Sequence, residues 1–157
     1  MRTLTHHALE LSRLAASRLA TAYVTIGADE GTLWLLDETK EALVPVWNSG
    51  PRAEEFVGKH RQPLSAGLIS VVCLTEQALC ENEVYRHAGQ DTTLDRRLGV
   101  LTCSMMAVPL RVGGEVRGVV SCVKLKKNAG DPDPAGFSQT DLEVLRAAVA
   151  RMGAEFP

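Results

Sequence analysis

The residues most able to do chemistry in this chain of 157 residues are four cysteines, Cys73, Cys80, Cys103 and Cys122. Their spacing contains no C-x-x-C pair and matches no zinc-binding pattern. Each stands in an apolar run, where a free cysteine behaves as a small buried hydrophobic residue. We therefore expect reduced thiols without disulfides, which is typical of a cytoplasmic location.

Neither the histidine at position 87 nor any short enzyme motif indicates a catalytic centre. His87 falls in an expected loop, and a lone histidine is more often structural or exposed than a ligand of a metal or haem iron. The chain contains no G-x-S-x-G, no P-loop and no H-E-x-x-H. Gly113-Gly114 is expected to join two strands, so it is a turn and not a phosphate loop. The sequence predicts no enzyme activity, no metal and no cofactor.

Charge and hydropathy exclude two further classes of partner. The net charge is −2, and no continuous basic stripe of the kind found in nucleic-acid-binding proteins is present. Lys124, Lys126 and Lys127 form a local cluster, which we interpret as a solvated strand end. No apolar run reaches the roughly 18 residues that a membrane span needs, and residues 1–30 are too polar for a signal peptide.

Amphipathic helices are predicted at both ends of the chain. Apolar residues recur at steps of three and four from Leu4 to Ile26, which predicts a helix over 4–26 that ends at Gly27. A second helix is expected to begin at Ser138, whose hydroxyl can accept from the amide of Asp141 as in a capping box. Its apolar residues follow a heptad pattern: Leu142, Leu145, Val149, Met152 and Phe156.

Between these helices the sequence alternates between strand and helix signals. Strands are predicted over 32–37, 43–47, 77–80, 104–112 and 115–126, helices over 67–75 and 92–98, and a flexible loop over 128–136. Pro45 favours an edge position or a bulge, and Gly113-Gly114 favours a two-residue hairpin turn. The last strand is apolar on both faces and needs cover on both sides. An antiparallel sheet with helices on both faces, forming one domain over 1–157, is the simplest packing.

Five segments, in the right order over residues 4–155, resemble those of a GAF domain. The matching segments are Gly27-Ala28-Asp29 with Thr32 to Asp37, Ser65 to Ser70, Leu98 to Leu110, Gly113 to Val119, and Phe137-Ser138 with Asp141 and Leu145. The resemblance implies an α+β fold in α/β/α layers that is related to PAS domains. In that fold the N- and C-terminal helices cover one face of an antiparallel sheet of about six strands. Short helices lie over a ligand pocket on the other face.

The resemblance also implies a ligand site. Residues 80–106 would form the roof and wall of the pocket, and the candidate ligand-binding residues are Trp47, Tyr85, Asp95, Arg96, Thr102 and Ser104. The two aromatic residues would stack on a flat ring, and the others offer donors, acceptors and one cation. In the alternative interpretation, Thr102 and Ser104 cap a helix end and Arg96 is solvated.

Comparison with the signature residues of two branches of the family limits the possible ligands. The cyclic-nucleotide-binding branch carries an Asn-Lys, Phe, Asp-Glu signature, and this chain has Lys126-Lys127, Phe137 and Asp141-Leu142 at the corresponding places. The match is partial, so the ligand is a cyclic nucleotide or another small metabolite. A second branch reduces free methionine sulfoxide, but the four cysteines do not follow the pattern associated with it.

Two hypotheses for function remain from the sequence. The first is a sensor that binds a small molecule and relays the signal to an output domain such as a kinase, cyclase or phosphohydrolase. The second is a dimerisation and relay module with no ligand, which the apolar seams of the two terminal helices favour. Both predict a homodimer formed through the terminal helices and a chain that is part of a longer protein. An open cavity favours the first hypothesis, and a filled one favours the second.

Overall fold

A computed structural model describes residues 6–156, so the expected helix start at Leu4 lies outside the described residues. In chain order the elements are α1 (His6–Ile26), β1 (Glu30–Leu36), β2 (Ala42–Asn48), the short 3-10 helix η1 (Ala53–Glu55), β3 (Gln62–Pro63), α2 (Leu68–Thr75), β4 (Leu79–Glu81), the short 3-10 helix η2 (Val84–Arg86), α3 (Thr93–Leu98), β5 (Leu101–Val112), β6 (Glu115–Lys126) and α4 (Gln139–Glu155).

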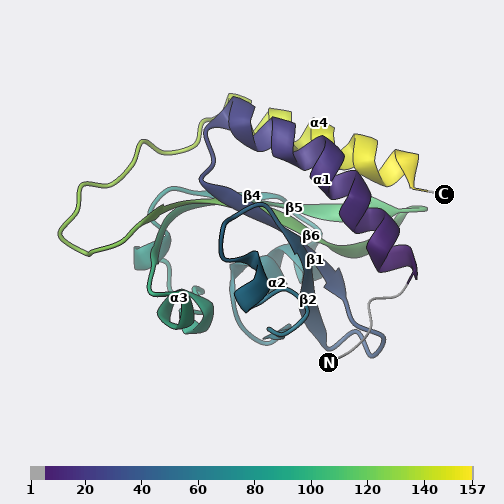
Figure 1. The fold of residues 1–157 in the computed structure, drawn as a ribbon, viewed down its shortest axis with the longest axis horizontal. Coiled ribbons are helices and arrows are strands. Elements are labelled where there is room, and N and C mark those ends of the chain that lie inside the picture. Colours follow the sequence, from purple (N-terminus) through teal and green to yellow (C-terminus); the bar gives the residue numbers. More distant parts are fainter. Residues whose placement is uncertain (1–5, 157) are drawn as a thin grey trace.

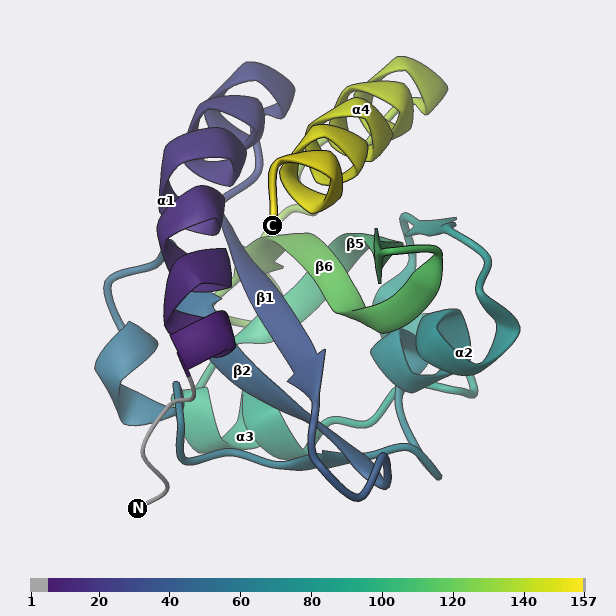
Figure 2. The same cartoon turned by 90° about the vertical axis from the view of Figure 1, so that its right-hand side faces the viewer.

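The strands of the described region form one antiparallel sheet of six strands in the order β3-β2-β1-β6-β5-β4. The helices α1 and α4 lie side by side and antiparallel on one face of this sheet, and α2 and α3 lie on the other (Figure 1, Figure 2). This arrangement confirms the α+β fold in α/β/α layers that the sequence predicts.

Local sequence signals for turns and caps are confirmed in detail. Gly27 has a positive φ of 69° and ends α1, a backbone conformation that glycine adopts without strain. Gly113 and Gly114 have φ values of 61° and 83°, as a type I′ hairpin turn requires. The hydroxyl of Ser138 accepts from the Asp141 amide, and the Asp141 carboxylate accepts from the Ser138 amide. This capping box fixes the start of α4.

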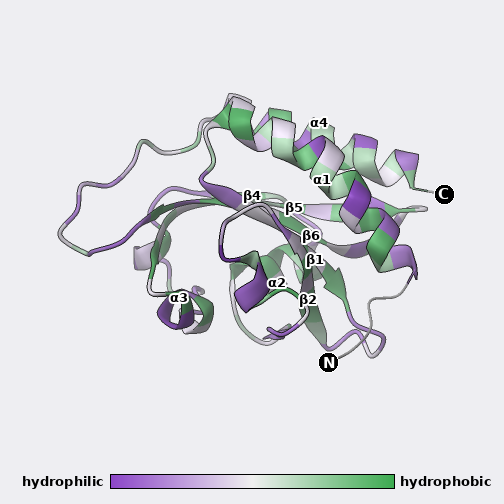
Figure 3. Ribbon diagram, in the orientation of Figure 1, coloured by the Kyte–Doolittle hydropathy of each residue, from purple (hydrophilic) through white to green (hydrophobic). Residues whose placement is uncertain are grey.

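The apolar seams of α1 and α4 pack inside the chain and do not form an outer surface. Leu145 and Met152 of α4 are 0% exposed, and they share one core with the buried face of α1. Figure 3 shows hydrophobic and hydrophilic residues alternating along both helices, as expected where one side covers a sheet. The prediction that the α4 seam faces a partner subunit is therefore wrong, because the sheet and α1 already cover it. A homodimer through another surface stays a prediction.

Strand alternation decides which side chains face the helices and which face the opposite layer. Leu33 pairs with Trp47, and both belong to the core under α1 and α4. Trp34, one residue further along β1, belongs to the second core with Ile69 and Val72 of α2. Alternate residues of a strand point to opposite faces, so the two tryptophans lie on opposite sides of the sheet.

One expectation for the sheet is confirmed, and two features differ from it. The register of β1 and β2 shifts beside Pro45, and β2 is an interior strand paired with β1 and β3. Pro45 is thus accommodated at a bulge, which is one of the two positions that the sequence predicts for it. The short strand β3 was not predicted, because two residues give no periodicity, and β5 begins three residues earlier than expected.

None of the helices described within residues 6–156 is both long enough and apolar enough to cross a membrane.

Candidate functional site

A pocket lies between the sheet and the layer that contains α2 and α3. The space available inside it to the centres of water molecules is about 90 Å³, several times the roughly 10–15 Å³ that one water molecule needs. Its lining residues are Glu30, Thr32, Trp34, Phe56, Gln62, Gly67, Leu68, Ile69, Gln90, Asp91, Leu94, Asp95, Leu98, Val100, Thr102, Met105, Ser121, Val123 and Leu125. The lining is mainly apolar with a small set of polar groups, as in most small-molecule sites.

The floor of the pocket is built by alternate residues of β1 and β6. Thr32 and Trp34 point into it from β1, and Ser121 points into it from β6. The Trp34 indole Nε1 donates to Ser121 Oγ over 3.1 Å, and Asn48 Nδ2 donates to Thr32 Oγ1 over 2.9 Å. These bonds fix the orientation of the floor and satisfy polar groups that are buried there.

The roof and wall come from the segment around α3 and from Gln62 of β3. Thr102 donates to the carboxylate of Asp95 through its amide (2.8 Å) and its hydroxyl (2.9 Å). Gln62 Nε2 donates to Asp91 Oδ2 and to the carbonyl of Ala66, each over 2.9 Å. The side chain of Gln62 therefore ties β3 to the chain on both sides of α2.

The titratable groups of the lining are acidic. Burial raises the pKa of Glu30, and the hydrogen bond from Asn48 opposes this shift in part. Burial likewise raises the pKa of Asp95 against its two hydrogen bonds with Thr102. Hydrogen bonds from the Thr93 side chain, Gln62 and the Thr93 amide lower the pKa of Asp91 to about 2. Burial thus disfavours the charged forms of Glu30 and Asp95 more strongly than their hydrogen bonds favour them.

The structure brings together two of the six candidate residues in the pocket, Asp95 and Thr102. Arg96 is exposed beside a surface depression on the outside of α3. Ser104 is 1% exposed and precedes Met106 by two residues, so it faces the core under α1 and α4. A bulge in β5 between Thr102 and Ser104 places these two residues on opposite faces of the sheet. Trp47 stacks on Tyr23 of α1 with 6.1 Å between ring centroids. Trp47 and Ser104 therefore lie across the sheet from the pocket.

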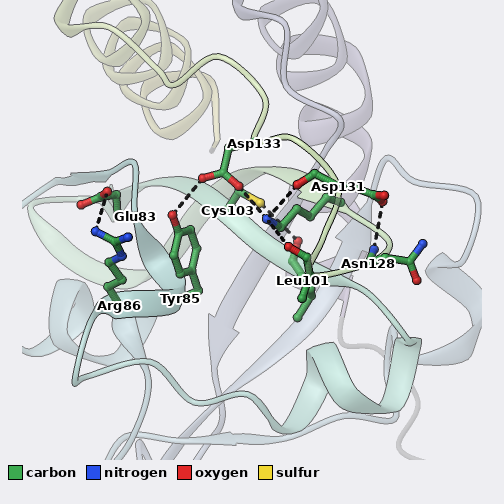
Figure 4. Close-up of polar contacts among 10 residues, drawn as sticks. Glu83, Tyr85, Arg86, Leu101, Cys103, Asn128, Asp131 and Asp133 are labelled. Carbon is green, nitrogen blue, oxygen red and sulfur yellow. Dashed lines mark hydrogen bonds and ion pairs between the residues drawn. The ribbon is translucent and has the colours of Figure 1, made fainter.

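Tyr85 is not among the lining residues of the pocket. Its side chain instead points to the loop before α4 (Figure 4). Its hydroxyl donates to Asp133 over 2.8 Å, and the Lys126 ammonium donates to the same carboxylate over 2.6 Å. Lys126 also donates to the carbonyls of Ala129 and Asp131, and it lies 5.6 Å from the centre of the Tyr85 ring. These contacts anchor the loop and account for Tyr85 without a ligand.

The four cysteines, all of them in the described part of the chain, lie away from the pocket lining. Cys73, Cys103 and Cys122 are buried and Cys80 is exposed, and all four are unpaired thiols. Burial raises the pKa of Cys122 to about 12, and it also raises the pKa of each of the other three. Thiols with raised pKa values are poor nucleophiles at neutral pH.

Several lining residues were missed by the sequence analysis, chiefly Glu30, Thr32, Trp34, Asp91 and Ser121. A signal for the first three was present, because Glu30, Thr32 and Trp34 alternate along one strand and place polar or amphipathic side chains on the same face. Ser121 is the one hydroxyl between Val119 and Val123 on the pocket face of β6. Asp91 carries no periodic signal because it lies in a loop.

Similar folds occur among solved structures at low sequence identity. The GAF domain of an Acinetobacter phosphoenolpyruvate-protein phosphotransferase is 18% identical, with 97% of this chain and 93% of that chain covered at a TM-score of 0.69. The second GAF domain of DevS from Mycobacterium smegmatis is 19% identical, with coverage of 96% and 92% and a TM-score of 0.70. Free methionine-R-sulfoxide reductase from Neisseria meningitidis, solved with its substrate, is 20% identical, with coverage of 94% and 77% and a TM-score of 0.70.

These structural neighbours share the fold, and their identity is too low to transfer an activity. The comparison with curated protein sequences found no match. A family model described as the GAF domain matches residues 8–154, which is nearly the whole chain. The match includes every strand of the sheet and both layers of helices. The chain therefore belongs to the GAF domain family.

Proposed function

We propose that this GAF domain is a non-catalytic sensor that binds a small molecule in the pocket and relays its occupancy through α1 and α4 to an output domain. The observation that carries the proposal is the pocket itself. It is open, it lies under α2 and α3, and it combines an apolar lining with hydrogen-bonded polar groups held by rigid strands. A relay module without a ligand would be expected to have this space filled.

The ligand in this proposal is a small metabolite other than a cyclic nucleotide. Residues at the positions of the cyclic-nucleotide signature have other contacts. Lys126, which stands where the signature has Asn, holds the loop through Asp133. Phe137 and Asp141 match the signature, but Phe137 is 5% exposed in the core under α4 and Asp141 caps α4. None of these three is part of the pocket lining.

A direct route connects the pocket floor with the end of α1. Asp29, in the short link after α1, donates from its amide to the carbonyl of Val123, and its carboxylate accepts from the amide of Leu125. Val123 and Leu125 line the pocket. A ligand that shifts this part of β6 would therefore displace the C-terminal end of α1. The guanidinium of Arg18 joins α1 to Glu155 at the end of α4.

The output domain and the homodimer are part of the same proposal. A kinase, cyclase or phosphohydrolase connected to α4 would receive the movement of the helix pair. Two large apolar side chains on α1 remain exposed, Leu9 at 42% and Val24 at 83%, and they offer an alternative surface for dimerisation.

Reduction of free methionine sulfoxide is the enzymatic alternative. The structural likeness to a reductase of this kind favours it, but the positions of the thiols do not. A sulfoxide bound in the pocket would meet no cysteine among the described lining residues. We therefore propose sensing as the function.

The proposal is tested by a thermal-shift screen of the purified domain against a library of small metabolites. A ligand at a hundredfold excess over Kd stabilises the folded state by about 2.7 kcal/mol. Val123→Phe, which fills the pocket, should abolish the stabilisation by any hit, whereas Val24→Phe on the exposed side of α1 should preserve it. Absence of any hit, or a hit that is unaffected by Val123→Phe, would contradict ligand sensing in this pocket.

A further inference from the structure

The charges that line the pocket define the class of ligand. Three carboxylates belong to its described lining residues, Glu30, Asp91 and Asp95, while that lining contains no Lys, Arg or His. The ion pairs found in the described residues involve none of the three. The pocket therefore presents negative charge that the protein does not pair.

Neighbouring cations leave this charge largely uncompensated. Arg52 interacts electrostatically with Glu30, but its guanidinium is bound to the carboxylate of Glu55 and to the carbonyl of Leu98. His60 lies near Asp91, and burial lowers the pKa of His60, which favours its neutral form. No ion pair with Asp95 is found in residues 6–156, and its partner is the uncharged Thr102.

The rest of the lining fits an apolar group beside a charge. Trp34 and Phe56 contribute aromatic rings, and Leu68, Leu94 and Met105 contribute aliphatic surface. Aromatic faces attract cations through their quadrupole and bind apolar rings by stacking. The limited volume favours a molecule much smaller than a nucleotide.

On these grounds we propose that the pocket selects a small organic cation, an ammonium or guanidinium group attached to a short apolar chain or ring. The inference rests on the proposed sensing function and specifies its ligand. The cationic group lies against Asp95 and Glu30, where charge-assisted hydrogen bonds form with little competition from water. The apolar part lies against Trp34 and the aliphatic residues of α2 and α3. A phosphate or carboxylate ligand would meet repulsion from all three acids.

Three probes of one shape and different charge test this proposal by isothermal titration calorimetry: phenethylammonium chloride, 2-phenylethanol and sodium phenylacetate. The ammonium compound should bind about tenfold or more tightly than the alcohol, since one charge-assisted bond contributes at least a factor of this size. The anionic compound should bind most weakly of the three.

Variants that remove one negative charge test whether Asp95 and Glu30 cause the preference for the ammonium compound. Asp95→Asn and Glu30→Gln should each weaken binding of the ammonium compound about tenfold and leave binding of the alcohol unchanged. Retained binding of the alcohol shows that the variant is folded. Glu143→Gln removes an exposed acid from α4 and should change neither affinity.

The possible outcomes separate this proposal from the sensing function. Equal or tighter binding of the alcohol or the phenylacetate overturns the cation preference and leaves the pocket as a ligand site. A preference for the ammonium compound that survives both variants overturns the assignment to Asp95 and Glu30. No binding of any probe, with neutral or anionic hits in the metabolite screen, overturns the cation proposal alone. No binding and no hit contradicts the sensing function itself.

Discussion

The amide and the hydroxyl of Thr102 both donate to the carboxylate of Asp95, over 2.8 Å and 2.9 Å. The pair joins α3 to the start of β5 and holds a carboxylate at the wall of the pocket. Burial raises the pKa of Asp95, and the two bonds from Thr102 act in the opposite direction. The two hydrogen bonds from Thr102 thus favour the charged form of Asp95, whereas burial disfavours that form.

Thr102→Val should lower the free energy of unfolding by about 1–2 kcal/mol at pH 7, because a carboxylate that is partly buried loses one donor. The loss should shrink as the pH falls. The pKa of folded Asp95 is already raised, and once Asp95 is protonated the missing donor has less effect. Urea unfolding at several pH values measures both effects. Thr25→Val, on the exposed side of α1, is the matched control and should change stability little.

Asp91 should contribute stability that is likewise present at neutral pH and lost in acid. Its pKa is lowered from 3.8 to about 2 in the folded state, so its contribution is present above pH 3.8 and disappears as the pH falls towards 2. Asp91→Asn should therefore destabilise the domain near neutral pH by about 1–2 kcal/mol, a value reduced for partial exposure. Unfolding curves of wild type and variant should converge at acidic pH. A constant difference across the range would show that the charge is not responsible.

The buried seam of α4 predicts a large difference between two glutamate substitutions. Met152 is 0% exposed, whereas Ala147 lies at an exposed position of the same helix. Met152→Glu should destabilise the domain by about 3 kcal/mol or more, because it removes core packing and buries a charge. Ala147→Glu should leave the stability nearly unchanged. If both variants are equally stable in urea, α4 does not pack on the sheet as described.

The capping box predicts a smaller effect at the start of α4. Ser138→Ala should cost about 1 kcal/mol of stability, since the amide of Asp141 loses its acceptor. Thr140→Ala, at an exposed position of the first turn, serves as the control and should have little effect. A melting temperature that Ser138→Ala leaves unchanged would argue against this helix start.

The sequence predicted the elements with strong local signals. Gly113-Gly114, the cap at Ser138 and the heptad-like seam of α4 each depend on residues close in sequence, and the structure has all three as helix or turn features. The sequence could not predict which surface the seam packs against. A stripe of apolar residues has the same pattern whether it covers the chain's own sheet or a partner subunit. Only the packing of α4 on α1 and β5 distinguishes the two.

The sequence predicted only part of the candidate site, because it shows which segment forms the wall of the pocket but not which face of the sheet a side chain occupies. Asp95 and Thr102 were found because they lie in the segment that forms the wall of the pocket. The sequence favours Trp47 and Trp34 equally, because both are aromatic residues on neighbouring strands. The strand register that places them on opposite faces of the sheet is a tertiary property. The chemistry of Tyr85 suits a ligand contact, but its hydroxyl is bound to Asp133, which is 48 residues away and which the sequence does not identify as its partner.

The central claim, that the pocket under α2 and α3 is the ligand site, is tested most directly by the indole N–H signals of the two tryptophans in a ¹H–¹⁵N spectrum. Trp34 lines the pocket and donates to Ser121, whereas Trp47 stacks on Tyr23 across the sheet. Trp47→Phe assigns the two signals. Addition of a saturating hit from the thermal-shift screen should shift the Trp34 signal and leave the Trp47 signal in place. A stationary Trp34 signal, or equal shifts of both, would contradict the claim.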